Sequence, residues 1–321
     1  MSNFSGIGQN NSPTLLVYRS EVSTMHAHNR IWASLAALAI LTLAVPKLSP
    51  GQPASSSSHG DEPARSCSDL HIRFEHGPAV VESEQQTITK TETPTLRVQA
   101  EYNGGVQVVG WDNDTYGVTL CKAAASGGNA EEILSEIHLT LQNGKLGVSG
   151  PSSHSRWTAH LLVNAPRAAS LDVAVNNGPL SLIGVDGNVR VRAENGPITV
   201  ASSTGNLELN AQNGPVDLEG NSGKLNVQAQ NGPVTLSLNG KNWNGSGVEA
   251  HANNGPLTLR IPTGYQSGVL VESDGTSPFD CHASACSEAR KSWDENRKSI
   301  QFGSGPTMIH LTTLNGPISI N

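Results

Sequence analysis

Four acidic residues and two arginines fall in one regular stretch of the chain and are the first candidates for chemistry. Glycoside-cleaving enzymes hold two carboxylates at a fixed separation, often beside a basic group. The acids here are spread over more than one repeat, so stacking of the repeats would be needed to bring them all together. Charges on a solvated face have the same spacing, and we favour that interpretation. The residues are Asp172, Glu194, Asp217 and Glu219, with Arg190 and Arg192.

The cysteines offer a second kind of chemistry. The motif CHASAC contains Cys281, His282 and Cys286, which are three possible metal ligands. No second cluster at zinc-like spacing accompanies them, so we expect no metal and no cofactor. In an oxidising compartment four cysteines favour pairing. Cys281 with Cys286 is the short-loop candidate and leaves Cys67 for Cys121, although the count alone permits other pairings.

Motifs of the common enzyme classes are missing from the sequence. No Ser/His/Asp order, phosphate loop, HExxH or CxxC motif occurs, and the 11 histidines are scattered. The formal net charge is -7, with no Lys/Arg run or basic-aromatic stripe. We therefore expect a non-enzymatic protein without a nucleic-acid partner.

The tripeptide Asn-Gly-Pro organises the second half of the chain. Its first three intervals are each 18 residues, the next is 23 and the last is 61. The extra segment KNWNGSG, residues 241–247, lengthens the fourth interval, and the fifth must hold more than one repeat. The asparagines of the tripeptides are Asn177, Asn195, Asn213, Asn231, Asn254 and Asn315.

Apolar residues recur at fixed distances from each of these asparagines. The positions six and four residues before the asparagine are always apolar, and two alternating apolar positions follow the turn. Each repeat therefore predicts two short strands with one buried face. The column six residues before the asparagine reads Leu171, Val189, Leu207, Leu225, Val248 and Ile309.

The proline distinguishes between two ways of using this pattern. Asn-Gly between alternating strands is a strong hairpin signal, but the residue after the glycine must then donate its N–H across the turn. Pro197, Pro215 and Pro233 have no N–H to donate. Coils stacked in parallel avoid this conflict and explain the constant period. We therefore expect an all-β solenoid with coils of about 18 residues and Asn-Gly-Pro corners, where the asparagine amides form a structural ladder rather than a ligand-binding row.

The N-terminal part has a different character. The apolar run IWASLAALAILTLAV, residues 31–45, suits a signal peptide and falls short of the roughly 20 residues of a spanning helix. We expect residues 1–48 to be a leader with a signal peptide or an uncleaved membrane anchor, with Met25 as an alternative start. Residues 49–66 are rich in Ser and Pro and predict a disordered linker, which leaves residues 67–321 for the solenoid domain.

Two segments depart from the regular repeat. Leu96 to Asp112 predicts a degenerate coil in which the extra residue Tyr102 acts as a bulge. A cysteine-containing insertion at about 272–302 interrupts the last interval, and its middle, SEARKSWDENRKS, is compatible with a short helix. Such an insertion either adds contacts specific to this protein or caps the stack, and we favour the cap.

The order of these segments resembles that of a known family. VQAEYNGGVQVVGWD, LLVNAPRAASLDVAVNNG, the stacked Asn-Gly coils and RIPTGYQSGVLVESDG together resemble the bacterial putative adhesin domain, a family of unknown function in exported envelope proteins. The resemblance covers Leu96 to Asn321 and implies a single-stranded right-handed β-helix-like fold. It brings no catalytic residues, and the cysteine-containing insertion departs from the family pattern.

These observations predict an exported adhesin-like or cell-envelope scaffold protein. Its place would be the periplasm, the cell envelope or the outside of the cell, and its partner an envelope or extracellular protein or polysaccharide. One alternative is an envelope sensor or regulator held at the membrane by the apolar run. A β-helix enzyme acting on polysaccharide is the less favoured alternative, because a fold alone does not establish a function.

Overall fold

The computed structural model describes residues 56–58, 62–74, 77–153, 156–274 and 277–321. The chain divides into two units, residues 1–47 and 48–321, and the described residues all belong to the second. The predicted leader, the apolar run and Met25 lie outside the described residues. Within the described part, no helix is both long and apolar enough to cross a membrane.

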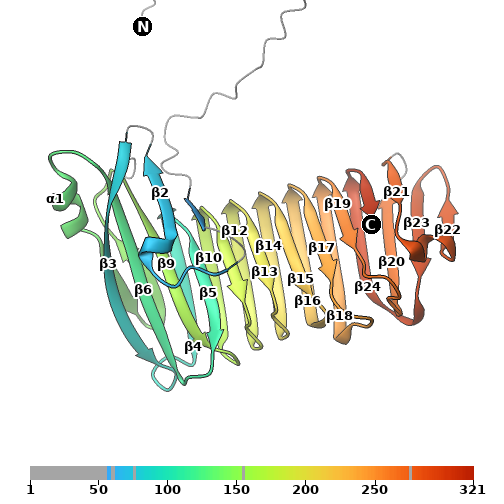
Figure 1. Ribbon diagram of the computed structural model, residues 1–321, viewed down its shortest axis with the longest axis horizontal. Coiled ribbons are helices and arrows are strands. Elements are labelled where there is room, and N and C mark those ends of the chain that lie inside the picture. The colour runs from blue at the N-terminus through green and yellow to red at the C-terminus, as the bar shows by residue number, and fades with distance from the viewer. Residues whose placement is uncertain (1–55, 59–61, 75–76, 154–155, 275–276) are drawn as a thin grey trace, which may run out of the picture. The chain divides into compact units, whose positions relative to one another are not determined.

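The fold is all-β and consists of two large, mostly parallel sheets (Figure 1). The sheet of 13 strands has the order β1 (Ser56–Ser58), β2 (Leu70–Phe74), β3 (Gly77–Thr89), β6 (Thr115–Ala125), β9 (Trp157–Pro166), β5 (Val106–Trp111), β11 (Leu180–Ile183), β13 (Ile198–Ala201), β15 (Val216–Gly220), β17 (Val234–Leu238), β19 (Leu257–Arg260), β25 (Ile318–Ile320) and β21 (Phe279–Cys281). The sheet of 12 strands has the order β22 (Arg290–Trp293), β23 (Arg297–Phe302), β20 (Ser267–Asp274), β24 (Ser304–Asn315), β18 (Asn244–Asn254), β16 (Ser222–Asn231), β14 (Asn206–Asn213), β12 (Asn188–Asn195), β10 (Ser170–Asn177), β4 (Thr95–Asn103), β8 (Lys145–Ser149) and β7 (His138–Gln142). The one α-helix described is α1 (Ala130–Ser135), and two short 3-10 helices cover Cys67–Asp69 and Ser284–Ser287.

Each repeat contributes one strand to each sheet. β10 pairs with β12 in parallel so that Leu171 lies opposite Val189, and β12 pairs with β14 with the same offset of 18 residues. In the other sheet β11 pairs with β13 in parallel, with Leu180 opposite Ile198. Equivalent residues of successive repeats are therefore direct neighbours in both sheets.

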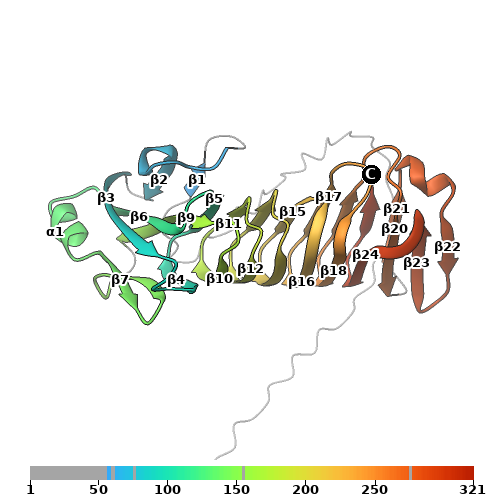
Figure 2. The same cartoon turned by 90° about the horizontal axis from the view of Figure 1, so that it is seen from below.

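The two sheets form two layers, and the apolar columns fill the space between them (Figure 2). Side chains alternate between the faces of a strand, so every second residue of each repeat points into this space. The column that begins at Leu171 is buried throughout. Burying a side chain of this size stabilises the fold by about 1.5–3 kcal/mol.

The Asn-Gly-Pro corner is explained by backbone geometry. At one corner the N–H groups of Gly178 and Leu180 donate to the carbonyls of Asn195 and Pro197 in the next repeat, both at 2.9 Å. The proline between the two donors needs no N–H for this ladder. Gly196 has a φ of +148°, and a Cβ there would lie 2.1 Å from the carbonyl oxygen of Gly178. Only glycine allows successive corners to approach so closely.

The N-terminal end of the described unit is less regular. β3, β6 and β9 pair antiparallel before the parallel run begins. β4 and β5 form the expected degenerate coil, and the predicted bulge is confirmed by a register shift where Ala100 and Asn103 pair with Val175 and Asn177. The segment AEEILS forms α1, and the buried ammonium group of Lys122 donates to the carbonyl oxygen of Leu134 at 2.8 Å.

Part of the predicted linker is folded against the sheet. β1 lies inside the expected range 49–66, and Ala64 is buried. The backbone N–H of Ala64 donates to the side-chain oxygen of Gln107 at 2.9 Å, and the Gln107 amide donates back to the Ala64 carbonyl at 2.7 Å. This exchange of hydrogen bonds ties residues just before Cys67 to the first coil.

The last repeat occupies an unexpected place in the stack. β24 and β25, the final strands of the chain, pair with β18 and β19 on one side and with β20 and β21 on the other. Beyond β20, β23 and β22 extend the sheet as an antiparallel pair. The predicted helix over 287–299 is wrong, because Arg290–Trp293 and Arg297–Phe302 are strands that satisfy their backbone groups in this pairing.

Candidate functional site

The outward side of the sheet of 12 strands carries a broad array of polar side chains. Because residues alternate along each strand, the residues between the buried columns all point away from the core. Parallel pairing then places equivalent residues about 4.8 Å apart on neighbouring strands. We call this array the polar face; it comprises Asp172, Arg190, Arg192, Glu194, Glu208, Asn210, Asn226, Gln228, Glu249, His251, Glu272, His310 and Thr312.

Ion pairs link neighbouring strands across this face. The Arg190 guanidinium donates to one carboxylate oxygen of Glu208 through two nitrogens, at 2.9 and 3.1 Å. Arg192 donates to Asp172 at 2.7 Å. Exposed pairs of this kind contribute only about 0–1 kcal/mol to stability. Their clearer effect is to hold the charged groups in fixed positions on the face.

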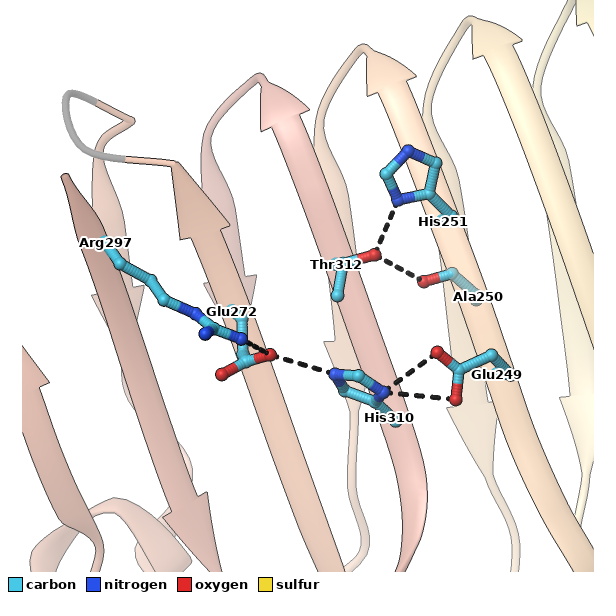
Figure 3. Close-up of polar contacts among 7 residues, drawn as sticks. All are labelled: Glu249, Ala250, His251, Glu272, Arg297, His310 and Thr312. Atoms are coloured by element: carbon cyan, nitrogen blue, oxygen red, sulfur yellow. Dashed lines mark hydrogen bonds and ion pairs between the residues drawn. The ribbon is translucent and has the colours of Figure 1, made fainter.

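Toward the C-terminal end of the sheet a histidine lies between two carboxylates (Figure 3). His310 on β24 approaches Glu249 on β18 through Nδ1, at 2.9 and 3.1 Å from its two oxygens. The Nε2 atom of the same ring lies 3.0 Å from Glu272 on β20. The Arg297 guanidinium on β23 donates to that same oxygen of Glu272. Four strands are thus joined by one chain of charged groups.

Glu272 is the most buried member of this chain, with 8% of its surface exposed. Burial raises the pKa of its carboxyl, but the hydrogen bonds and charges of His310 and Arg297 outweigh this effect, and the net pKa is lowered. Both nitrogens of His310 face carboxylate oxygens, which accept hydrogen bonds and cannot donate them. Each nitrogen of His310 is therefore already in contact with a neighbouring strand, and the arrangement links β18, β24 and β20.

A second histidine on the face forms a shorter contact. His251 Nδ1 lies 2.7 Å from the hydroxyl of Thr312, its direct partner on the neighbouring strand. The same hydroxyl lies 3.4 Å from the carbonyl oxygen of Ala250 (Figure 3). This contact also fixes the position of a side chain on the polar face.

The acids singled out in the sequence fall into two groups that lie on opposite sheets. Asp172 and Glu194 belong to the polar face, whereas Asp217 and Glu219 lie on β15 in the other sheet and point outward from it. Glu219 accepts a hydrogen bond from the Asn239 amide at 2.9 Å. Since the two sheets lie on either side of the core, Asp172 and Glu194 cannot act together with Asp217 and Glu219. Asp217 and Glu219 lie two residues apart on the outward face of β15.

The structure places the six asparagines of the Asn-Gly-Pro corners in one row. The last five side-chain amides each donate to the side-chain oxygen of the preceding asparagine in the row, with distances of 3.0–3.1 Å. The row runs along the edge of the coils and is exposed to solvent. The four inner amides thus each use one donor and one acceptor on their neighbours in the row, as in a ladder of amides.

Both predicted disulfides are present in the structure. Cys67 is bonded to Cys121, and Cys281 to Cys286. The two cysteines of the CHASAC motif are therefore occupied with each other, and His282 is exposed beside them. Among the described residues, no group of three or more His, Cys, Asp or Glu side chains is placed to hold a metal ion.

One buried histidine stands apart from the polar face. His160 on β9 is 5% exposed, and its Nδ1 accepts a hydrogen bond from the backbone N–H of Gly105 at 3.1 Å. Burial lowers its pKa from 6.5 to about 4. The imidazole is therefore neutral at neutral pH and supports the first coil.

The linked charged residues around His310 were not predicted from the sequence, although the repeat pattern places two of them side by side. His310 and Glu249 both stand five residues before the asparagine of their repeat, so their adjacency follows from the repeat alignment. Glu272 and Arg297 lie in the irregular interval before Asn315, where no repeat places them.

Comparisons with known proteins give the following similarities. No protein-family model matches the chain, and no curated protein does. Among solved structures it is similar to a putative cell adhesion protein from Clostridium sporogenes, with 13% identity, a TM-score of 0.32, and coverage of 75% of this chain and 98% of that one. A putative adhesin from Bacteroides fragilis has 11% identity and a TM-score of 0.31, with coverage of 75% and 96%. A putative lipid binding protein from Parabacteroides distasonis has 10% identity and a TM-score of 0.28, with the same coverage. Because the identities and TM-scores are this low, the function proposed below rests on the residues of this chain.

Proposed function

We propose that the chain is a non-enzymatic binding protein of the adhesin or envelope-scaffold type. Its frame is a single-stranded right-handed β-solenoid over residues 67–321, with coils of about 18 residues and Asn-Gly-Pro corners. It is exported to the periplasm, the cell envelope or the outside of the cell. Its partner is an envelope or extracellular protein or polysaccharide that lies along the polar face.

The observation that carries this proposal is the polar face itself. Its charged side chains are held by contacts between strands, such as those of Arg192 with Asp172 and of His310 with Glu249. Groups fixed before a partner arrives lose little conformational freedom on binding. A face with charges of both signs at the spacing of β-strands suits an extended partner that carries polar groups along its length.

The disulfides support the choice of compartment. Cys67–Cys121 and Cys281–Cys286 are disulfides, and such bonds are typical of secreted and envelope proteins. Fractionation of native cells with N-terminal sequencing of the mature chain tests this part of the proposal. A processed chain outside the cytoplasm supports it. An intact chain held in the membrane would instead favour the envelope sensor, and a reduced cytoplasmic chain would contradict export.

Binding is tested with variants of the two faces. The full chain is passed over immobilised envelope polysaccharides and extracellular-matrix proteins. Arg190→Ala with Arg192→Ala removes two charges from the polar face. Lys241→Ala with Arg260→Ala removes the same charge from exposed positions outside it.

We expect the polar-face variant to lose binding to the immobilised polysaccharide or protein that retains the unsubstituted chain. The control variant should still bind it. Equal binding by both variants would contradict a role for the polar face. Depolymerisation of any polysaccharide in the panel, abolished by Asp217→Ala or Glu219→Ala, would favour the enzyme instead.

A further inference from the structure

The final residues of the chain occupy a slot between two segments that precede them in sequence. We call Ser304–Asn321, which contains β24 and β25, the C-terminal coil. It lies between the coil of β18 and β19 and the coil of β20 and β21, and it is parallel to both (Figure 1). The regular repeats before it, by contrast, are added to the stack in chain order.

The slot is framed by contacts that do not involve the C-terminal coil. The backbone N–H of Gln266, just before β20, donates to the carbonyl oxygen of Lys241 at 2.8 Å. The backbone N–H of Trp243 donates to the hydroxyl of Ser267 at 2.9 Å. Trp243 is 5% exposed, and its indole N–H donates to the carbonyl oxygen of Gly223 at 3.0 Å. The segment KNWNGSG thus fastens the start of β20 to the coils on the other side of the slot.

The C-terminal coil completes both sheets. Its residues Ile309, Leu311, Ile318 and Ile320 are buried between the layers, and Asn315 donates to Asn254 in the asparagine row at 3.1 Å. Without the coil, β18 and β20 would each present an unpaired edge with an apolar gap between them. Such edges pair readily with any strand of matching register. A second copy of the same coil has that register.

The connection into the coil is accessible. Gly303, Ser304 and the next three residues are exposed, and Gly303 has a φ of +84°. A groove of about 910 Å³ lies beside this crossing and is lined in part by Phe302, Gly303 and Gly305. In this crossing Ser304 and Thr307 pair with Ser267 and Gly268 at the start of β20, and these contacts open when the coil swings out while β23 stays paired with β20.

We propose that the C-terminal coil is exchanged between two copies of this chain. Each copy places its coil in the slot of the other and makes there the contacts that the coil makes within one chain. This exchange is independent of what the polar face binds. A coil within its own chain has an effective concentration of about a millimolar, so the swapped dimer forms in greater amount as refolding is carried out at higher protein concentration.

The test uses two single variants of the full chain. His251→Cys places a thiol on β18, and Thr312→Cys places one on β24, at positions that are direct partners. The two variants are mixed, unfolded with their native disulfides intact, refolded together at increasing concentration and oxidised mildly. Arg192→Cys mixed with Asn210→Cys is the control, since these positions are direct partners on β12 and β14, outside the C-terminal coil.

We expect a several-fold excess of disulfide-linked heterodimer from the first mixture over the control, with a peptide that joins positions 251 and 312. A yield equal to that of the control, or links only between identical positions, would overturn the proposal. The unsubstituted chain provides a second measurement by native mass spectrometry after the same refolding. A dimer that increases with protein concentration supports exchange, and monomer at every concentration contradicts it.

Discussion

Acid should destabilise this protein through one buried imidazole. The pKa of His160 is about 4 in the folded chain because the ring is buried, and it is 6.5 for an unperturbed histidine. As the pH falls below 6.5 the unfolded chain takes up a proton that the folded chain does not. The unfolded state then binds more protons, so the free energy of unfolding falls with pH.

The size of the effect follows from the two pKa values. One unit of pKa difference corresponds to about 1.4 kcal/mol, so a separation from 6.5 to about 4 costs about 3 kcal/mol when the pH reaches 4. Near pH 5 the cost is about 2 kcal/mol, and above pH 7 it vanishes. The folded chain begins to take up the same proton near pH 4, and the loss then levels off.

The assay is denaturant unfolding at a series of pH values between 7.5 and 4. His160→Gln removes the titration and retains a side-chain oxygen that can accept from the N–H of Gly105. His282→Gln is the matched control, because His282 is exposed. We expect the difference in unfolding free energy between wild type and His160→Gln to fall by about 3 kcal/mol across this range. A flat difference, or an equal fall for His282→Gln, would refute the reasoning.

Three further predictions concern the corners and the polar face. Gly196→Ala should lower the free energy of unfolding, measured by heat or denaturant, by more than about 3 kcal/mol, because the new Cβ meets the Gly178 carbonyl at a positive φ. Gly220→Ala is the control and should change the free energy of unfolding little, because a Cβ there has no atom within 4 Å. Asn213→Ala removes two amide hydrogen bonds from the asparagine row and should lower the free energy of unfolding by about 1–2 kcal/mol. Gln212→Ala is the control, and an equal loss of stability in that variant would contradict a stabilising role of the row. Glu272→Gln should flatten the pH dependence of stability below about pH 4.5. The lowered pKa of the Glu272 carboxyl stabilises the fold above the unfolded pKa, and this stability is lost as the pH falls through the folded pKa. If the free energy of unfolding of Glu272→Gln depended on pH below 4.5 as that of the unsubstituted chain does, the contacts of His310 and Arg297 would not lower the pKa of Glu272.

The regular coils were predictable because two independent signals agree. The period-two alternation around Val173 and Val191 indicates strands with one buried face, and the constant interval of 18 residues indicates that they pair in register. The proline of the corner added a physical reason, since a missing N–H is harmless only where no ladder bond is needed. Both signals can be read from neighbouring repeats in the sequence, and they also predict which residues point outward on the polar face.

The order of the last coils could not be read in the same way. Val269 and Val271 pair with Ile309 and Leu311, which in turn pair with residues of β18. All of these residues belong to the same apolar columns, so the pattern alone does not say which coil lies next to which. The hydrogen bonds of Trp243 with Gly223 and Ser267 connect the coils on either side of the C-terminal coil, and no repeat pattern predicts them.

The predicted helix in the insertion failed for a related reason. The stretch Arg290–Trp293 has charged and polar residues that suit a helix surface, but it also pairs with β23 at the edge of the sheet. An edge strand with charged side chains is protected against further pairing, so its composition resembles that of a solvated helix. The contact of Arg297 with Glu272 depends on the pairing of β23 with β20, which the sequence pattern did not predict.

The most direct test of the account is whether successive repeats stack in register along one face. Spin labels are attached to cysteines at position 97 and, in separate double variants, at positions 208, 226 and 310, which lie on β4, β14, β16 and β24. With about 4.8 Å between neighbouring strands, the account predicts backbone separations near 14, 19 and 29 Å, which increase in that order. Distances that do not grow with position in the sheet would contradict the stacking, and with it the continuous polar face.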